Sequence, residues 1–373
     1  MRTGGLRACP SPAKTKGAGR QPRRHGRGEG VSSGAVVVTG ASGYIGSHVV
    51  SNLLARGREV RATVRDASDP DRVDHLLALP VSDGGSLEIV EMDLMDAGAV
   101  ARAIEGCCEV IHTAAAVRIT AKKPQSQIVD PSVIGTQNVL DAIDAAGCVE
   151  RLVHTSSTAA IRPMKWQDGQ TLTTETWAED ATLEGNPYGL AKFTAERLVR
   201  EWHTAKDADS RPRMVTINPC VVFGPPLSKK HLRGSVSFIM TLLRREIPFV
   251  IPMHMSIVDV RDVAEAHVRA LTMGEDSGRY LVVSGQMWFR DIARALKDGH
   301  PDLGVPTRQI PYSLSLIVSL FHPRISLSWA RAHLNKRLFW DATPAERDLG
   351  MEWRPPEEAV LGSVPPIVEN GWI

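Results

Sequence analysis

The sequence lacks any apolar run long enough to cross a lipid bilayer. A membrane-spanning helix needs about 20 apolar residues, and the nearest run, residues 314–321, is short and contains Ser315 and Ser319. We therefore expect no integral membrane segment. The run is better explained as a helix of a substrate-binding region, with a membrane-surface patch as the alternative.

Cysteine is scarce, and its spacing excludes the usual cysteine-based sites. The five cysteines are odd in number, and no two of them form a CxxC pair. They are Cys9, Cys107, Cys108, Cys148 and Cys220. Because this pattern fits neither a disulfide framework nor a metal site, we expect reduced thiols, no bound metal and a cytoplasmic location.

Residues 1–33 contain almost no acid and almost no large apolar side chain. Glu29 is the sole acid against eight Lys and Arg, and Leu6 is nearly the only large aliphatic residue before Val31. This composition predicts a disordered basic leader, with an organelle-targeting peptide as the alternative. The whole chain has a net charge of +2 and the leader +7, so the remainder is near −5. This negative charge argues against nucleic-acid binding by the folded part of the chain.

The rest of the chain alternates between short β-rich runs and longer helical patterns. Residues 35–39 are continuously apolar, as is typical of a strand buried on both faces of a parallel sheet. A helical pattern follows and ends at Gly57, a residue suited to a helix C-terminus. Further strands are expected over residues 60–64, 87–92, 110–113, 151–155 and 214–218, and a helix over 133–146. This alternation predicts an α/β fold with a doubly wound parallel sheet.

The alternation of strands and helices changes near residue 224. Prolines and shorter elements begin there, and a Trp- and Arg-rich stretch follows at 329–340. We therefore expect one α/β domain over residues 34–223. Residues 224–373 are expected to form mainly a smaller substrate-binding region, with some elements returning to the first sheet.

A glycine-rich turn, TGASGYIG at residues 39–46, lies directly between the first strand and the first helix. Gly40 permits a tight exit from the strand, Gly43 lets the backbone approach a pyrophosphate, and Gly46 lets the helix pack closely on the sheet. Phosphates would lie at the helix N-terminus, where unpaired N–H groups favour negative charge. The loop residues expected to contact a dinucleotide are Gly40, Ser42, Gly43, Tyr44, Ile45 and Gly46.

The residue after the second strand indicates which dinucleotide fits. Arg65 stands where a carboxylate would select NAD, and its guanidinium can bind a 2′-phosphate, which favours NADP. Asp66 directly behind it could take the ribose role, so NAD stays open. Asp93 and Leu94 follow the third strand, where Asp93 could accept the adenine amino group or cap a helix. Small residues follow the fourth strand, where the cofactor's ribose could lie; they are Ala114, Ala115 and Ala116.

Residues 186–192, NPYGLAK, have the form of a helix start, with Asn186 as N-cap and Pro187 at the first helical position. Tyr188 and Lys192 are four residues apart and therefore share one helix face. A free phenol has a pKa of about 10, and a nearby ammonium group, together with the positive charge of an oxidised nicotinamide, lowers it. We expect Tyr188 to exchange a proton with the substrate and Lys192 to hold the nicotinamide ribose.

Ser156 and Ser157 close the fifth strand, where a hydroxyl group can stabilise charge that develops on a substrate oxygen. Four histidines lie on separate elements without ligand spacing and are expected to be core or surface residues. They are His112, His154, His254 and His267. Asp262 is expected to cap the helix that begins with Val263, and most of the eight tryptophans are expected to serve packing.

Together these motifs resemble the extended short-chain dehydrogenase/reductase superfamily, over roughly residues 35–355. The segments that carry the resemblance are TGASGYIG (39–46), VRATVRD (60–66), VIHTAA (110–115), GTQNVL (135–140), HTSSTAA (154–160), PYGLAK (187–192), NPCVVFGP (218–225) and DVRDVAEAH (259–267). Within the NAD-dependent epimerase/dehydratase family, the chain looks most like dihydroflavonol reductase-like and 3β-hydroxysteroid dehydrogenase-like members.

The resemblance implies a Rossmann-type sheet and a Ser–Tyr–Lys catalytic set. It places the serine at Ser157, with Ser156 as the fallback, and the backbone of Pro219 and Val222 against the nicotinamide. It also implies a small-molecule substrate and a homodimer. The chain departs from many relatives at Thr158, where they have Ala or Gly, and residues 225–256 match no particular subfamily, which leaves the substrate open.

The leading hypothesis is an NADP-dependent oxidoreductase that interconverts a carbonyl and an alcohol, with Ser157 and Tyr188 polarising the oxygen. An NAD-retaining nucleotide-sugar epimerase or dehydratase is the first alternative, and Arg65 argues against it. A non-catalytic NADP-binding sensor or scaffold is the second, and the presence of Tyr188 and Lys192 argues against it.

Overall fold

The computed structural model describes residues 34–115, 121–208, 210–321 and 327–373. The leader expected over residues 1–33 and the residue Ala116 lie outside these ranges. A seven-stranded sheet forms the centre of the molecule, with the strand order β10-β7-β5-β4-β1-β2-β3, and every pair in it is parallel. Its strands are β1 (Val36–Thr39), β2 (Glu59–Val64), β3 (Ser86–Glu91), β4 (Glu109–His112), β5 (Arg151–Thr155), β7 (Arg213–Pro219) and β10 (Gly278–Val282). The predicted doubly wound parallel sheet is confirmed.

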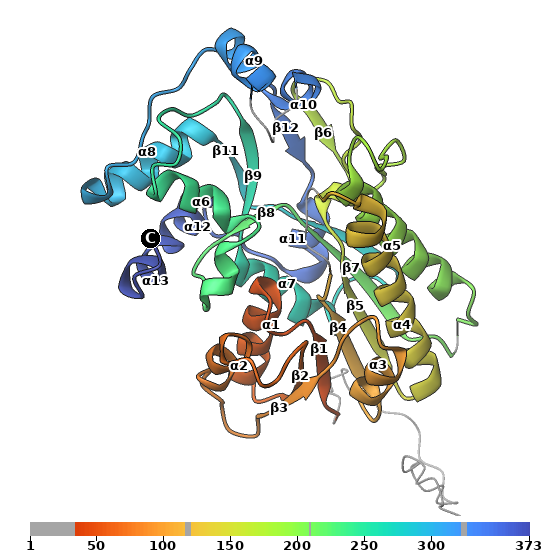
Figure 1. Ribbon diagram of the computed structural model, residues 1–373. Helices are drawn as coiled ribbons and strands as arrows, with labels where there is room; N and C mark the ends of the chain where they lie inside the picture. The colour runs from red at the N-terminus through yellow and green to blue at the C-terminus, as the bar shows by residue number, and fades with distance from the viewer. Residues whose placement is uncertain (1–33, 116–120, 209, 322–326) are drawn as a thin grey trace, which may run out of the picture.

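Helices cover both faces of this sheet (Figure 1). One face carries α1 (Tyr44–Ala55), α2 (Pro70–Leu77), α7 (Val260–Ala270) and α11 (Thr343–Leu349), and the other carries α3 (Ala97–Ile104), α4 (Asp130–Ala146) and α5 (Pro187–Thr204). The side chains of β1 alternate between the two cores, with Val36 and Val38 in one and Val37 in the other. This alternation follows from the two-residue period of a strand and explains why β1 is continuously apolar.

A second layer follows β7. A three-stranded sheet is formed by β8 (Val221–Phe223), β9 (His254–Asp259) and β11 (Gly285–Trp288), and a parallel pair is formed by β6 (Gln170–Leu172) and β12 (Leu338–Trp340). The remaining helices are α6 (Val236–Leu243), α8 (Phe289–Gly299), α9 (Tyr312–Phe321), α10 (Leu327–His333), α12 (Pro356–Gly362) and α13 (Val364–Glu369). Short turns are η1 (Gln125–Val129), η2 (Thr158–Ala160), η3 (Lys229–Leu232) and η4 (Pro301–Leu303). The chain leaves the large sheet at β8 and returns to it at β10, so the two layers are interleaved.

The start of α7 differs from the sequence prediction. Asp259, the last residue of β9, is the N-cap, and its side chain accepts a hydrogen bond from the Arg261 N–H at 2.8 Å. The expectation that Asp262 caps this helix is wrong, because β9 runs directly into the helix one turn earlier. Asp262 is instead buried in the first turn, where it accepts a hydrogen bond from the Arg354 backbone N–H at 2.8 Å. It thereby ties α7 to the C-terminal segment.

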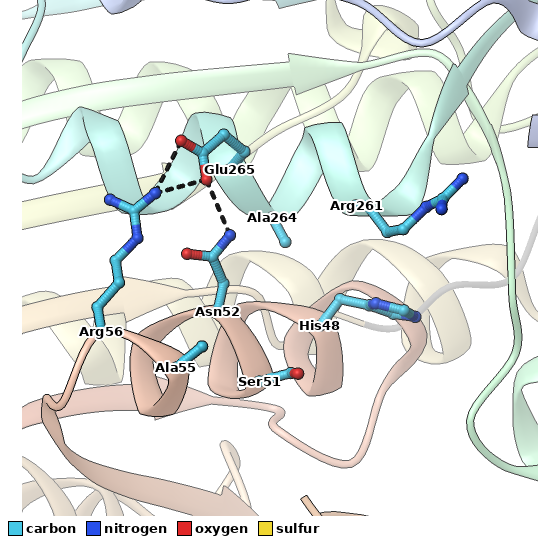
Figure 2. A pocket seen from close by; sticks show the side chains of 8 residues that line it. All are labelled: His48, Ser51, Asn52, Ala55, Arg56, Arg261, Ala264 and Glu265. Atoms are coloured by element: carbon cyan, nitrogen blue, oxygen red, sulfur yellow. Dashed lines mark hydrogen bonds and ion pairs between the residues drawn. The ribbon is translucent and has the colours of Figure 1, made fainter. Parts of the chain in front are cut away.

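Helices α1 and α7 are joined by charged side chains around a shallow hollow of about 240 Å³. Figure 2 shows Glu265 of α7 between Asn52 and Arg56 of α1, with oxygen–nitrogen distances of 2.9 and 2.6 Å. Burial raises the pKa of Glu265, but hydrogen bonds from Arg269, Asn52 and Arg56 outweigh it and lower that pKa to about 2. These charges satisfy one another, so the hollow is a seam between helices on the sheet face opposite α5.

Helix α9 includes the run 314–321 that the sequence predicts to be helical. Ser315 and Ser319 are buried, whereas Leu314, Ile317 and Leu320 are exposed. Within the described parts of the chain, no helix is both long enough and apolar enough to cross a membrane.

A buried ion pair at the amino edge of the sheet generates a stability prediction. Glu109 is only 1% exposed and binds Arg58, the residue before β2, and Arg151, the first residue of β5. Replacing Glu109 by Ala leaves the largely buried Arg58 guanidinium without its acid, and leaves Arg151 only the longer contact with Glu150, at 3.5 Å. We expect it to lower the free energy of unfolding by about 3 kcal/mol, measured by urea denaturation.

Glu88→Ala is the matched control, since Glu88 also pairs with an arginine of β2, Arg61, but is 61% exposed. Its effect should stay below about 1 kcal/mol. Equal losses in the two variants would contradict a special role for the buried pair.

Candidate functional site

The glycine turn after β1 is packed so tightly that a side chain at Gly40 or Gly46 would collide with its neighbours. Gly40 has φ +70°, and a Cβ placed on it would lie 2.8 Å from the Cα of Ala114. A Cβ on Gly46 would collide with the Gly40 carbonyl oxygen and lie 2.9 Å from Thr113 Oγ1. The turn is held by the Ala41 N–H, which donates to the Thr63 carbonyl at 2.9 Å. The required glycines leave the main chain accessible between β1 and β4, where the strand order reverses.

The N-terminus of α1 faces this crevice. Its N-cap is Gly43, no side chain caps the helix, and its first turn contains no acid. The unpaired N–H groups and the helix dipole therefore favour negative charge at this end of the helix. The loop's own side chains point elsewhere: the Tyr44 hydroxyl donates to the Gly224 carbonyl at 2.7 Å, and Ile45 packs against the core. The side chains of Tyr44 and Ile45 are thus engaged elsewhere, which leaves the main chain of the loop accessible.

The second layer also contacts this loop. His231 of η3 lies 3.2 Å from the Ser42 carbonyl oxygen, and His48 of α1 lies 2.9 Å from the Pro225 carbonyl oxygen. Sequence reasoning missed these contacts, because histidines without ligand spacing carry no local signal.

Arg65 and Asp66 differ in what they can still bind. Asp66 Oδ1 accepts hydrogen bonds from the N–H and the hydroxyl group of Ser68, at 2.9 and 2.7 Å, and these bonds lower its pKa. Arg65 is exposed, and its guanidinium donates to no acceptor among the residues that the structure describes. The geometry therefore leaves Arg65 able to bind a phosphate, whereas one oxygen of Asp66 is already engaged by a local turn.

The strand ends beyond β3 and β4 are less specific. Asp93 is exposed, and its Oδ1 accepts a hydrogen bond from the Met95 N–H at 2.9 Å. The N-cap of α3 is Asp96, not Asp93. The Leu94 carbonyl accepts a bond from Asn138 at 2.7 Å. Ala114 and Ala115 are half-buried beside the glycine turn, and Ala116 lies outside the described residues.

The first turn of α5 carries Tyr188. Asn186 caps the helix by accepting the Gly189 N–H at 2.9 Å, and Pro187 occupies the first helical position, as the sequence predicts. Burial raises the pKa of Tyr188 above 10.0, and a hydrogen bond with Ser157 opposes the rise. In the protein alone, Lys192 is therefore not among the groups that lower this pKa. Tyr188 is half-buried, and the Lys192 ammonium group donates to another acceptor.

Lys192 lies one turn along the same helix. Its Nζ donates to the Thr155 carbonyl at the end of β5, at 3.0 Å, and its side chain is buried. Burial lowers its pKa to about 8, although the nearby Glu196 carboxylate partly opposes this. Lys192 therefore carries its charge at neutral pH and loses it as the pH rises through about 8.

The two serines after β5 face different partners. Ser157 Oγ caps η2 through the Ala159 N–H at 3.1 Å and donates to the Pro219 carbonyl at 3.5 Å. Ser156 Oγ donates to Glu196 at 2.5 Å, inside the core. Of the two serines, Ser157 is the one close enough to Tyr188 to affect its pKa. The structure thus brings Ser157 and Tyr188 together and directs Ser156 away from them.

Pro219 and Val222 lie on successive strands. Pro219, at the end of β7, accepts the hydroxyl groups of Ser157 and Thr158 on its carbonyl. Val222 is buried in β8, and its carbonyl accepts a bond from Ser235 at 2.6 Å. Pro219 is therefore in direct contact with the Ser157 turn, whereas Val222 is one strand further away.

A buried polar network under this turn escaped the sequence analysis. Glu196, fully buried on α5, accepts bonds from Ser156, from Asn218 at 2.9 Å and from Arg279 of β10 at 2.5 Å. Asn218 also donates to the Ser157 carbonyl at 3.3 Å. One signal was present in the sequence: Glu196 follows Lys192 by four residues and so lies on the same helix face. Its partner Arg279 could not be identified from spacing.

Three of the histidines lie in the core beside the site. His112 contacts Thr39 at 2.7 Å, His267 contacts Thr155 at 2.7 Å, and burial lowers the pKa values of His112 and His267 to about 3 and 4. His154 is also buried. No cluster of three or more His, Cys, Asp or Glu suited to a metal ion occurs among the described residues.

Comparison with known proteins places this geometry in a family. Residues 36–283 match the model of the NAD dependent epimerase/dehydratase family. The chain is 36% identical over 279 residues to cinnamoyl-CoA reductase CAD2 of Medicago truncatula, covering 73% of this chain and 83% of that protein. It is 30% identical over 283 residues to the bifunctional dihydroflavonol 4-reductase/flavanone 4-reductase of Malus domestica, covering 75% and 80%.

A solved structure extends the likeness to the fold. Gre2 from Candida albicans in complex with NADPH superimposes with a TM-score of 0.72 and 30% identity, covering 90% of this chain and 98% of that one. The resemblance that the motifs indicate is confirmed. The chain belongs to the NAD dependent epimerase/dehydratase family, within the extended short-chain dehydrogenase/reductase superfamily.

Proposed function

We propose that the chain is an NADP-dependent reductase that converts a small ketone or aldehyde to the corresponding alcohol. The observation that carries this proposal is the meeting of Ser157, Tyr188 and Lys192 at the edge of the sheet that also holds the glycine turn. The relatives are named cinnamoyl-CoA and dihydroflavonol reductases, and Gre2 was solved with NADPH. Both facts support a carbonyl substrate and NADP.

The residues present fit this cofactor. Gly40 and Gly46 leave a cradle that any Cβ would fill, the uncapped N-terminus of α1 suits the pyrophosphate, and Arg65 suits the 2′-phosphate. We propose that Asp93, Ala114, Ala115, Lys192 and Pro219 complete the contacts. The hydride of the reaction comes from NADPH when it is bound.

The chain's own residues supply the proton and the electrostatic stabilisation. Ser157 and Tyr188 donate hydrogen bonds to the substrate oxygen, and Tyr188 Oη then gives up its proton to it. Because burial raises the pKa of Tyr188, the phenol stays protonated at neutral pH, as an acid in the reductive direction requires. The Lys192 ammonium group stabilises the phenolate that remains.

Three further points rest on the sequence and on the family resemblance. We propose that the enzyme acts in the cytoplasm and forms a homodimer. Residues 34–223 are proposed as the cofactor-binding part and residues 224–373 mainly as the substrate-binding part. An NAD-retaining epimerase or dehydratase remains the competing activity, and tightly bound NAD in the purified protein would favour it.

The cofactor proposal is tested with Arg65→Ser. Loss of a charge-assisted contact to the 2′-phosphate should raise the dissociation constant of NADPH about 10- to 100-fold and change that of NADH less than about threefold. Both constants are measured by titrating reduced-nicotinamide fluorescence. Asp66→Asn is the control and should leave NADPH affinity nearly unchanged. Equal weakening of both cofactors in Arg65→Ser would show that Arg65 does not bind the 2′-phosphate.

The catalytic proposal is tested with Tyr188→Phe. Removing the hydroxyl group should lower kcat about 10²- to 10⁴-fold while NADPH still binds, because only the proton transfer is lost. Steady-state kinetics with a panel of ketones and aldehydes gives the first number, and fluorescence titration gives the second. Tyr280→Phe removes another tyrosine hydroxyl, bonded to the Glu275 N–H at 2.8 Å, and should keep kcat. Undiminished turnover by Tyr188→Phe would refute the assignment.

The pH dependence of reduction should report Lys192. A lysine with a pKa of about 8 is charged below pH 8 and neutral above it. We therefore expect kcat/KM for reduction to be level below pH 8 and to fall above it, as the ammonium charge is lost. In Lys192→Met the level should be lower and this fall absent. A wild-type profile that stays level to pH 10 would exclude Lys192 as the titrating group.

A further inference from the structure

A second polar cluster, which the proposed chemistry does not use, follows directly after Ser157. The Arg162 N–H donates to the Thr158 carbonyl at 2.9 Å, in the turn that Ser157 caps. With a rise of about 2 Å per residue in such a turn, the Arg162 backbone lies within about 10 Å of Ser157. An arginine side chain reaches far enough from there to contact the distal part of a substrate held at Ser157.

Arg162 is half-buried and has no acidic partner among the described residues. Its guanidinium carbon lies 5.2 Å from the centre of the Trp166 ring, and among the described residues no carboxylate or carbonyl accepts a bond from its guanidinium. Burial lowers its pKa, and no acid opposes the shift. Arg279 provides the contrast. It lies 3.5 Å from the Trp177 ring and is also bound by Glu196 and by the carbonyl groups of Thr174 and Thr176.

Trp166 adds an unsatisfied donor to the same cluster. Its Nε1 is buried and has no hydrogen-bond partner among the described residues, while the His333 ring lies 4.8 Å away. Lys336 Nζ lies 5.9 Å from the Trp166 ring and adds a second positive charge. Burial and the Arg162 charge lower the pKa of His333 to about 4, so His333 is neutral. The acid close to Trp166 in sequence, Asp168, is already paired with Arg337.

A buried N–H donor such as Trp166 Nε1 is costly to leave without an acceptor, and a bound oxyanion would satisfy it. A guanidinium group matches a carboxylate with two parallel hydrogen bonds. Trp166 also packs beside an apolar cluster made by Ile161, Leu172, Leu281 and Leu338. The cluster therefore combines the flat apolar ring of Trp166 with the cationic group of Arg162.

We propose that Arg162 and the Trp166 indole N–H form a subsite for a carboxylate, and that the substrate is an aromatic carbonyl compound that carries this carboxylate away from the reacting carbon. This inference rests on the proposed reductase function and names the substrate class of the same site.

The first test compares the reduction of 4-formylbenzoate and of its methyl ester, which differ in charge but share the ring and the aldehyde. The ratio of kcat/KM for acid over ester is measured in the wild type, in Arg162→Leu and in Lys165→Leu. Arg162→Leu should lower the ratio about 10- to 100-fold. Lys165 is the exposed cation beside Trp166, and its replacement should leave the ratio unchanged. Equal losses in both variants, or none in Arg162→Leu, would overturn the inference.

Trp166→Phe is the second variant, since it removes the N–H donor and keeps an aromatic wall. We expect it to lower the same ratio about 3- to 10-fold, and an unchanged ratio would remove Trp166 from the subsite. This variant also answers the question if Arg162→Leu fails to fold, which thermal denaturation and NADPH titration would reveal.

A binding experiment separates this inference from the proposed function. Benzoate and benzamide are titrated calorimetrically into the protein saturated with NADP⁺. Tighter binding of benzoate that is lost in Arg162→Leu supports the subsite, even if no carbonyl compound is reduced; the reductase proposal would then fail alone. Reduction of aldehydes without any preference for benzoate or for the acid substrate would overturn the subsite and leave the reductase proposal intact.

Discussion

The arrangement of the site depends on one buried ion pair, between Glu196 of α5 and Arg279 of β10. The same carboxylate accepts bonds from Ser156 after β5 and from Asn218 in β7, so four segments meet at one side chain. Removing two charges from water is costly, and only such complete hydrogen bonding offsets it. These contacts hold α5 against the sheet in the position where its first turn, with Tyr188, packs on the Ser157 turn.

Features that the sequence predicted correctly depend on local chemistry. The glycine turn, the Asn186 cap and the buried strands are each specified by neighbouring residues, whose φ preferences, capping groups and periodicity act within a few positions. Features that escaped depend on distant residues. Glu196 and Arg279 are 83 positions apart, and the choice between Ser156 and Ser157 is made by what each hydroxyl group meets across the fold. The wrong cap at Asp262 arose from a boundary displaced by one helical turn, because Asp259 is an equally good capping residue.

The environment of Tyr188 illustrates how a fold biases a reversible reaction. A lysine one turn away suggested a lowered phenol pKa, yet the lysine charge is directed to the Thr155 carbonyl and burial of the ring prevails. A phenol held in its protonated form is ready to give a proton and poorly suited to take one. Burial also lowers the pKa of Lys192, so the charge that would stabilise a phenolate is itself sensitive to alkaline pH.

The return of the chain to the large sheet at β10 means that this protein cannot be divided at the apparent boundary near residue 224. A fragment that ended there would turn β7 into an open edge strand with unpaired N–H and C=O groups. It would also leave the Glu196 carboxylate buried without Arg279. The first half of the chain resembles a self-sufficient nucleotide-binding module, but the second half supplies both strand β10 of its sheet and the counter-charge of Glu196. An exchange of substrate-binding regions between relatives would therefore have to keep β10 and Arg279 with the first half of the chain.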